Sequence, residues 1–310
     1  MTEDLILYEV DKEKKIATIT INRPEKLNAL DFGEFAQITR LFREAEYDEN
    51  VKVIIWRGVG RAFCVGDDLD TFLHEYGMTD KDSGQPKYGR PHQRDRILAD
   101  RIGFGPGGIY QTIAYCLKAN ICQVQGYCYG GALGMALACD MTIAAEGAIF
   151  GHAGYRYMGP SAEGLLIPMF LNLGIKRTME LMLTGRPIEA KEAERIGMVN
   201  KVVPPDKLEE EVQRYAEAIA LLSLDGIVVG KCAKGLALDH LGVYGSMIGT
   251  ATHNLGTNIK WDPEDFNMLK EREKRGKKGA IRAREARYAH LGMDVESVKG
   301  EAGTSQKDSE

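Results

Sequence analysis

Apolar and polar residues alternate along this chain in runs that predict strands and helices in succession. The apolar positions in Leu5–Val10 and Ile16–Ile21, separated by a polar turn, are typical of a β-hairpin. Asp31 then precedes a segment whose apolar residues recur at helical spacing, and Glu34 completes a capping-box pattern. The N-terminal part therefore predicts a hairpin followed by an amphipathic helix.

The same alternation continues through the middle of the chain. Short apolar runs predict further strands, and runs of helical period between them predict helices. The predicted strands are Val51–Trp56, Ile121–Gln125 and Met141–Ala145, and the predicted helices are Ala132–Ala138, Leu165–Leu173 and Lys176–Leu183. Strands that alternate with helices indicate the α/β class, but they leave the arrangement of the sheet open.

The composition is that of a soluble globular protein. With 310 residues, 44% of them hydrophobic and 27% charged, the chain can build one large core, with or without a smaller appendage. A formal net charge of −5 gives no reason to expect a nucleic-acid partner. No apolar run approaches the roughly 20 residues that span a bilayer, and the acidic Met1–Asp4 segment does not resemble a signal peptide. We therefore expect a cytoplasmic protein without a membrane partner.

Cysteine usage and two unusual segments add to this description. The six cysteines lack the close pairing of a metal site, so we expect reduced, mostly buried thiols and no bound metal. The connection between Asp68 and Ile121 contains polar and glycine-rich stretches and is longer than a crossover requires, which predicts a lid or a pocket wall. A disordered surface loop is the alternative interpretation. Towards the C-terminus, Lys270–Arg287 is rich in basic residues.

Four segments carry motifs that can be compared with known families. They are Arg61–Leu69 (RAFCVGDDL), Gln125–Asp140 (QGYCYGGALGMALACD), Phe150–Gly164 (FGHAGYRYMGPSAEG) and Leu183–Ile188 (LTGRPI). In this order they resemble the active-site core of the enoyl-CoA hydratase/isomerase, or crotonase, superfamily. The resemblance implies an enzyme that acts on acyl-CoA thioesters, with CoA as part of the substrate and no separate cofactor.

The resemblance also implies an architecture. Residues 1–205 are expected to form a spiral core of ββα units with an oxyanion hole, and residues 206–290 a helical region that covers the CoA and mediates trimerisation. Residues 291–310 are expected to form a disordered tail. Since members of this family commonly assemble through the helical region, we expect a homotrimer or a dimer of trimers.

Two backbone N–H groups are assigned by the resemblance to the thioester oxygen. They belong to Asp67, which follows a glycine in the first motif, and to Gly131, which follows Gly130 at a predicted helix start. Glycine permits close approach of the backbone, and the first turn of a helix presents unpaired N–H groups. Two such donors would form an oxyanion hole that stabilises an enolate or a tetrahedral intermediate.

The resemblance breaks down at two positions that matter for the chemistry. Gly134 and Gly154 stand where a hydratase of the family carries its two catalytic glutamates. Glycine has no side chain and cannot transfer a proton. The standard hydration machinery is therefore absent, and any proton transfer must come from another group.

Four kinds of side chain are candidates for this proton transfer. Glu163 lies close to where related isomerases place an acidic residue, although it also suits the first turn of a helix. His152 has the side chain best matched to proton transfer at neutral pH, and Tyr155, with its neighbour Tyr157, could orient a substrate carbonyl. Asp67 carries a carboxylate as well as its N–H, but it could instead cap a turn together with the next aspartate.

Binding of CoA is assigned by the resemblance to two sets of groups. Backbone atoms of the first motif would hold the adenine, and basic side chains near the first strand pair or in the C-terminal helix would reach the phosphates. The CoA-binding candidates are Arg23, Lys26, Cys64, Val65, Asp67 and Gly130. A solvated basic surface is the alternative interpretation of the C-terminal run.

Three functions are compatible with these features. The first is hydrolysis of a C–C bond in a cyclic or β-oxo acyl-CoA, because family members without both glutamates include such enzymes. The second is an enoyl-CoA hydratase or double-bond isomerase whose base has moved to Glu163 or His152. The third is a non-catalytic paralogue that binds acyl-CoA without turnover.

Overall fold

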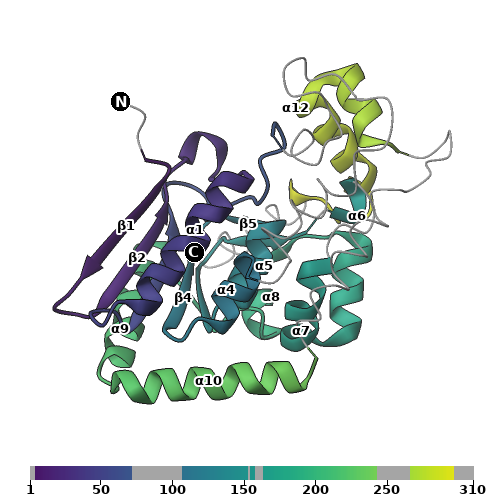
Figure 1. The fold of residues 1–310 in the computed structure, drawn as a ribbon. Helices are drawn as coiled ribbons and strands as arrows, with labels where there is room; N and C mark the ends of the chain where they lie inside the picture. Colours follow the sequence, from purple (N-terminus) through teal and green to yellow (C-terminus); the bar gives the residue numbers. More distant parts are fainter. Residues whose placement is uncertain (1–3, 72–106, 153, 158–162, 243–265, 297–310) are drawn as a thin grey trace, which may run out of the picture.

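The strands of the protein form two sheets, as seen in a computed structural model that describes residues 4–71, 107–152, 154–157, 163–242 and 266–296 (Figure 1). The larger sheet has the order β1 (Ile6–Asp11), β2 (Ile16–Ile21), β3 (Val53–Gly58), β4 (Ala119–Val124), β6 (Met141–Ala145) and β9 (Lys201–Val203). The smaller sheet has the order β5 (Tyr127–Tyr129), β7 (Ile149–Gly151) and β8 (Ile188–Glu189). Apart from the antiparallel pairs β1–β2 and β7–β8, neighbouring strands run parallel.

The predicted N-terminal elements are confirmed. β1 and β2 pair as an antiparallel hairpin in which Ile6 lies opposite Ile21. Helix α1 (Phe32–Tyr47) begins after Asp31, whose side chain accepts a hydrogen bond from the Glu34 N–H, while the Glu34 carboxylate accepts one from the Asp31 N–H. This reciprocal capping satisfies two N–H groups that the helix itself leaves unpaired.

A repeated strand–strand–helix unit links the two sheets. β4 belongs to the large sheet and continues into β5 of the small sheet, after which α5 (Gly131–Ala138) follows. β6 and β7 repeat this step and lead into α6 (Gly154–Tyr157) and α7 (Glu163–Thr184). The predicted spiral of ββα units is therefore present.

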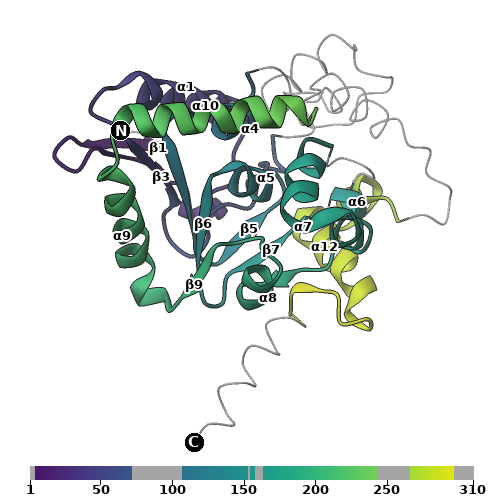
Figure 2. The ribbon, with the colours of Figure 1, turned by 90° about the horizontal axis from the view of Figure 1, so that it is seen from below.

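Helices cover both faces of the large sheet (Figures 1 and 2). The remaining helical elements are η1 (Pro24–Lys26), α4 (Ile109–Tyr115), α8 (Ala190–Arg195), η2 (Pro205–Lys207), α9 (Leu208–Ala220), α10 (Leu224–His240) and α12 (Met268–Ala289). The main core gathers buried side chains of α1, α4, α5 and α7, and a second core on the opposite face gathers Leu208, Val212 and Ala216 of α9. The site described below belongs to the main core.

The C-terminal helices are tied to the core by buried charged side chains. On α10, Lys231 Nζ lies 2.6 Å from Asp140 Oδ1, directly after α5. In α6, the buried Arg156 donates to the Thr184 carbonyl at 2.6 Å and to the Met293 carbonyl at 2.9 Å. Residues 291–296, which the sequence assigned to a disordered tail, are thus partly held against the body of the protein, and the rest of that tail lies outside the described residues.

Two further expectations concern segments that the structure does not describe in full. The predicted lid lies for the most part in residues 72–106, outside the described residues, although α4 forms the end of the same connection. Within the described ranges, no helix has the length and apolarity that crossing a membrane requires. The same ranges contain no cluster of side chains that could hold a metal ion.

Candidate functional site

Two loops that are distant in sequence meet at the start of α5. A Cβ atom placed on Gly66 would lie 2.8 Å from Gly131 N and 2.8 Å from the Tyr129 carbonyl oxygen. Gly66 also has φ +84°, a left-handed conformation that other residues rarely adopt. Glycine at this position therefore allows the two predicted donor segments to approach each other closely.

Backbone hydrogen bonds hold the loop that contains Gly66. The Cys64 N–H donates to the Tyr127 carbonyl at 3.1 Å, and the Cys64 carbonyl accepts from the Tyr129 N–H at 3.1 Å. On the other side, the Leu30 N–H donates to the Gly66 carbonyl at 2.9 Å. The loop that carries the first predicted donor is thus anchored both to β5 and to the segment before α1.

The second predicted donor lies at the first residue of α5. Gly131 presents an N–H that has no acceptor within the helix, and Gly130 before it makes the turn with φ +57°. The Gly130 N–H donates to the Gly151 carbonyl at 3.0 Å, so the end of β7 lies beside this turn. The segments that carry the second and third motifs are therefore adjacent.

Tyr110 of α4 is a site residue that the sequence did not indicate. It is buried, and its hydroxyl donates to the Gly131 carbonyl at 3.1 Å. Burial, followed by the negative charge of Asp67, raises the pKa of Tyr110 well above its ordinary value, so the phenol stays protonated. No local pattern around Tyr110 reveals this contact, because it joins residues from two different helices.

The two glycines that the sequence resemblance places at the positions of the hydratase glutamates lie near this turn. Gly134 is buried in α5, one helical turn beyond Gly131, and Gly154 is the first residue of α6. Residues three apart in a helix share one face. Gly131 and Gly134 therefore leave the same side of α5 without side chains.

The predicted proton-transfer residues differ in what the structure shows of them. His152 directly follows β7, and burial lowers its pKa to about 4, so its imidazole is neutral at pH 7. Tyr155, in α6, is half-buried and packs against the main core. Glu163 is the first residue of α7, but its side chain lies outside the described part of the structure, as does that of Tyr157.

Asp68, the second residue after Gly66, carries a buried carboxylate that binds two cations. Asp68 is 1% exposed, and its carboxylate lies 3.0 Å from Arg23 Nη2 and 2.7 Å from Lys26 Nζ. Burial by itself raises the pKa of Asp68, but hydrogen bonds from Lys26 and the Asp70 N–H, with two nearby positive charges, bring it below its ordinary value. Asp68 makes a turn cap, because its carboxylate accepts from the Asp70 N–H at 2.9 Å. The predicted phosphate ligands Arg23 and Lys26 are both engaged with this buried carboxylate.

We expect Asp68→Asn to lower the free energy of unfolding by about 2–4 kcal/mol at pH 7, because the positive charge of Arg23 loses its buried partner. The pKa of Asp68 is lower in the folded than in the unfolded state, so its carboxylate stabilises the fold above the unfolded pKa of about 3.9. This contribution is lost as the pH falls through the folded pKa. Urea unfolding of both proteins at several pH values should therefore show a difference that shrinks below about pH 4.

A matched control for this prediction is Asp70→Asn, because the Asp70 carboxylate also faces Lys26 but is 45% exposed. Exposed ion pairs contribute little, so we expect a loss of less than about 1 kcal/mol. An equal loss of unfolding free energy in Asp68→Asn and Asp70→Asn would show that the buried ion pairs of Asp68 contribute no more than the exposed ones of Asp70.

The other predicted CoA-binding groups of the first motif are Cys64 and Val65. The Cys64 thiol donates to the Asn28 carbonyl at 2.9 Å, and burial raises its pKa, so it stays protonated. Both backbone groups of Cys64 are engaged in the pairing with β5 described above. Val65 is half-buried beside them. Cys64 thus maintains the loop through its thiol and its backbone.

Basic side chains of α12 converge on the same loop. Arg272 Nη1 donates to the Leu69 carbonyl at 2.7 Å, and Lys277 Nζ lies 3.0 Å from Asp70 Oδ1. Lys26 Nζ lies 3.3 Å from the other oxygen of the Asp70 carboxylate. The structure therefore brings the basic C-terminal run and the predicted N-terminal phosphate ligand together at one position.

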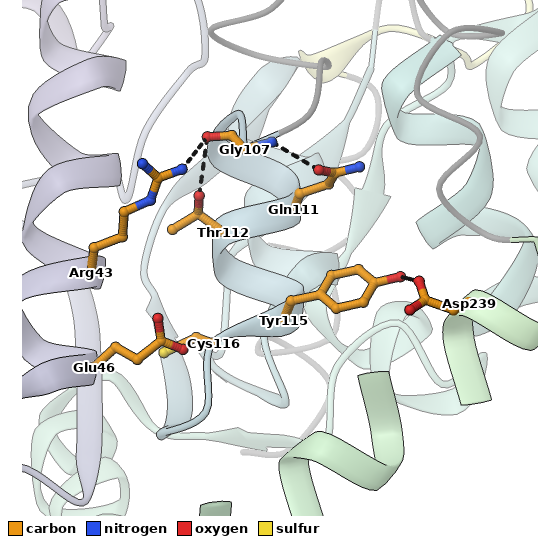
Figure 3. Close-up of a pocket in the computed structure, with 8 residues that line it drawn as sticks. All are labelled: Arg43, Glu46, Gly107, Gln111, Thr112, Tyr115, Cys116 and Asp239. Atoms are coloured by element: carbon orange, nitrogen blue, oxygen red, sulfur yellow. Dashed lines mark hydrogen bonds between the residues drawn. The ribbon is translucent and has the colours of Figure 1, made fainter. Parts of the chain in front are cut away.

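A cavity of about 340 Å³ lies between α1, α4 and α10 (Figure 3). It is lined by Arg43, Glu46, Gly107, Gln111, Thr112, Tyr115, Cys116 and Asp239. Its polar groups bind one another: Arg43 donates to the Gly107 carbonyl at 2.8 Å, and the Tyr115 hydroxyl contacts the Asp239 carboxylate. The side chain of Tyr110 leaves α4 on the buried face, so this cavity is separate from the turn at Gly131.

Comparison with known proteins identifies the family. The profile of the enoyl-CoA hydratase/isomerase family matches residues 11–229. The probable enoyl-CoA hydratase EchA12 of Mycobacterium tuberculosis is 32% identical over 242 residues, which make up 77% of this chain and 79% of that protein.

Solved structures agree with the sequence match. An enoyl-CoA hydratase/isomerase from Xanthobacter autotrophicus Py2 has a TM-score of 0.74 at 32% identity, covering 92% of this chain and 99% of that chain. An enoyl-CoA hydratase from Mycobacterium smegmatis has a TM-score of 0.75 at 26% identity, covering 92% and 94%. The chain belongs to the enoyl-CoA hydratase/isomerase family and has the crotonase fold. It is an acyl-CoA enzyme of that superfamily.

Proposed function

We propose that the N–H groups of Asp67 and Gly131 form an oxyanion hole, and that the enzyme uses it to hydrolyse a C–C bond in a cyclic or β-oxo acyl-CoA. One observation carries this proposal: the two predicted donor loops meet closely at Gly66 and Gly131. The sequence motifs support it, because they place Gly134 and Gly154 where a hydratase carries its glutamates. The site thus keeps the means to stabilise a thioester enolate, and the space of two side chains is left for a larger acyl group.

The chemistry of such a cleavage suits an oxyanion hole. Addition of hydroxide to the β-carbonyl gives a tetrahedral intermediate, and the C–C bond then breaks with its electron pair moving towards the thioester. The resulting enolate oxygen is stabilised by the two N–H donors. Protonation of the α-carbon completes the reaction, which yields a carboxylic acid and a saturated α-carbon on the acyl-CoA.

An assay with matched substrates tests this proposal. The purified protein should release a carboxylate from a cyclic β-oxo acyl-CoA or from a linear β-oxo acyl-CoA, measured by mass spectrometry of the CoA product. It should hydrate crotonyl-CoA far more slowly, because it lacks the two glutamates. Rapid hydration of crotonyl-CoA without cleavage of the β-oxo substrates would reject the proposal.

The second candidate is an enoyl-CoA hydratase or isomerase with a relocated base at Glu163 or His152. It is favoured by the names of the relatives. Burial lowers the pKa of His152 to about 4, which makes its imidazole neutral but a weak base at pH 7. In the assay above, His152→Gln and Glu163→Gln should then each be compared on crotonyl-CoA. Binding of both substrate types without any turnover would instead indicate a non-catalytic acyl-CoA-binding protein.

The phosphates of CoA are expected at the meeting point of Lys26, Arg272 and Lys277. These three cations contact the exposed carboxylate of Asp70, and Lys26 also contacts Asp68, so among the described side chains positive charge exceeds negative charge there. Lys26 remains 35% exposed and can reach a phosphate without leaving Asp68.

Trimerisation through the C-terminal helices and a cytoplasmic location complete the proposed function.

A further inference from the structure

The carboxylate of Asp67 lies beside the face of α5 that the glycines leave empty. A Cβ atom placed on Gly131 would be 3.5 Å from Asp67 Oδ2 and 3.1 Å from the Tyr110 hydroxyl. Gly134 shares this face one turn further along the helix. The side chains of Asp67, from a loop, and Tyr110, from α4, thus approach the side of α5 on which a hydratase would place its first glutamate.

The setting of Asp67 contrasts with that of its neighbour Asp68. The Asp68 carboxylate is almost completely buried between two cations and maintains the loop. Asp67 is half-buried, and the negative charge it places near Tyr110 contributes to raising the pKa of that phenol. Tyr110 therefore remains a hydrogen-bond donor, and it holds the Gly131 carbonyl at the same turn.

From this geometry we propose that the Asp67 carboxylate is the proton-transfer group of the site. This inference rests on the proposed function in one respect, because it takes the Asp67 and Gly131 N–H groups as the oxyanion hole. One residue then serves twice: its N–H binds the thioester oxygen, and its carboxylate exchanges a proton with the α-carbon. Tyr110 is a positioning residue that orients the Gly131 peptide.

The proton balance of the cleavage reaction closes with a single carboxylate. Asp67 takes a proton from water, and the hydroxide adds to the β-carbonyl carbon. The C–C bond breaks, its electron pair forms the enolate, and the β-carbonyl carbon leaves as a carboxylic acid. Protonated Asp67 then gives its proton to the α-carbon and returns to the carboxylate. No second acid or base is required, which agrees with the loss of both hydratase glutamates.

The test uses a saturated acyl-CoA, so that it does not depend on any C–C cleavage. Butyryl-CoA incubated with the protein in D₂O should exchange its α-hydrogens, because the carboxylate takes a proton from the α-carbon and returns a deuteron. We expect Asp67→Asn, which keeps the N–H and the size of the side chain, to lower this exchange by about 10²–10⁴-fold. The Kd for butyryl-CoA should change by less than about threefold, because the oxyanion donors remain.

Asp225→Asn is the matched control, since it makes the same replacement at an exposed position in the first turn of α10 and should exchange like the wild type. Absence of exchange in the wild-type protein, or exchange by Asp67→Asn at the wild-type rate, would overturn the inference. If Asp67→Asn does not fold, Asp67→Ala with added acetate replaces it: recovery of exchange by acetate supports the inference, and no recovery overturns it. Loss of exchange in Asp67→Asn without cleavage of any β-oxo substrate by the wild type would reject the proposed function and leave the inference standing.

Discussion

Gly131→Pro should lower the turnover number by about 10²–10³-fold, the usual effect of removing one oxyanion donor. Proline has no N–H, and it is well tolerated at the first position of a helix, where Gly131 lies. The replacement therefore deletes the proposed donor while preserving α5. Steady-state kinetics together with a thermal unfolding curve measure both effects.

The control is Gly131→Ala, which keeps the N–H but adds a Cβ atom. That atom would meet the Tyr110 hydroxyl at 3.1 Å, so a modest loss from crowding is expected in both variants. The difference in turnover number between Gly131→Pro and Gly131→Ala then measures the contribution of the Gly131 N–H. Equal activity of the two variants would remove Gly131 from the oxyanion hole.

Gly66→Ala should damage both stability and catalysis. The new Cβ atom would lie 2.8 Å from Gly131 N and from the Tyr129 carbonyl, both of which belong to the backbone and cannot rotate away. The left-handed φ of +84° adds its own cost, so we expect a loss of about 2–5 kcal/mol in the free energy of unfolding. The two loops should move apart, and turnover should fall by at least about 10²-fold as one donor is misplaced.

Gly147→Ala separates backbone strain from collision. Gly147 has φ +77°, close to that of Gly66, but an added Cβ atom there meets no atom of the described residues within 4 Å. We expect a loss of about 1–2 kcal/mol with unchanged turnover. Urea unfolding and kinetics of the two variants, measured side by side, distinguish the effects. A Gly66→Ala protein that behaves like Gly147→Ala would show that the close approach of the loops is unimportant.

Local patterns were sufficient to predict most of the fold. The hairpin follows from apolar alternation, and α1 follows from the Asp31–Glu34 capping pair, because both signals lie within a few residues of the element they specify. The predicted helices Leu165–Leu173 and Lys176–Leu183 correspond to the two parts of α7, which are separated at Gly174 by its φ of +74°. The two-residue strand β8 was not predicted, since its pairing with β7 is set by tertiary contacts.

The site was less accessible to prediction. Glycine-rich motifs indicated which backbones meet, because glycine is required where a side chain would collide. The sequence contained no comparable pattern from which the partners of the charged side chains could be predicted. Arg23 and Lys26 were predicted to bind phosphate, and the structure adds their bonds to Asp68, more than 40 residues further along the chain. The contact of Tyr110 with Gly131 likewise depends on how α4 packs against α5.

The buried Arg156 has a consequence for how the protein matures as it is made. Its guanidinium lies 3.5 Å from the centre of the Tyr288 ring and donates to the Met293 carbonyl, while its backbone belongs to the short helix that begins at Gly154. During synthesis on the ribosome, α6 leaves the exit tunnel well before those two partners do. Of the partners named above, only the Thr184 carbonyl is made early, so the guanidinium keeps part of its hydration until α12 and Met293 arrive. The short helix that begins at Gly154 gains these late contacts only then.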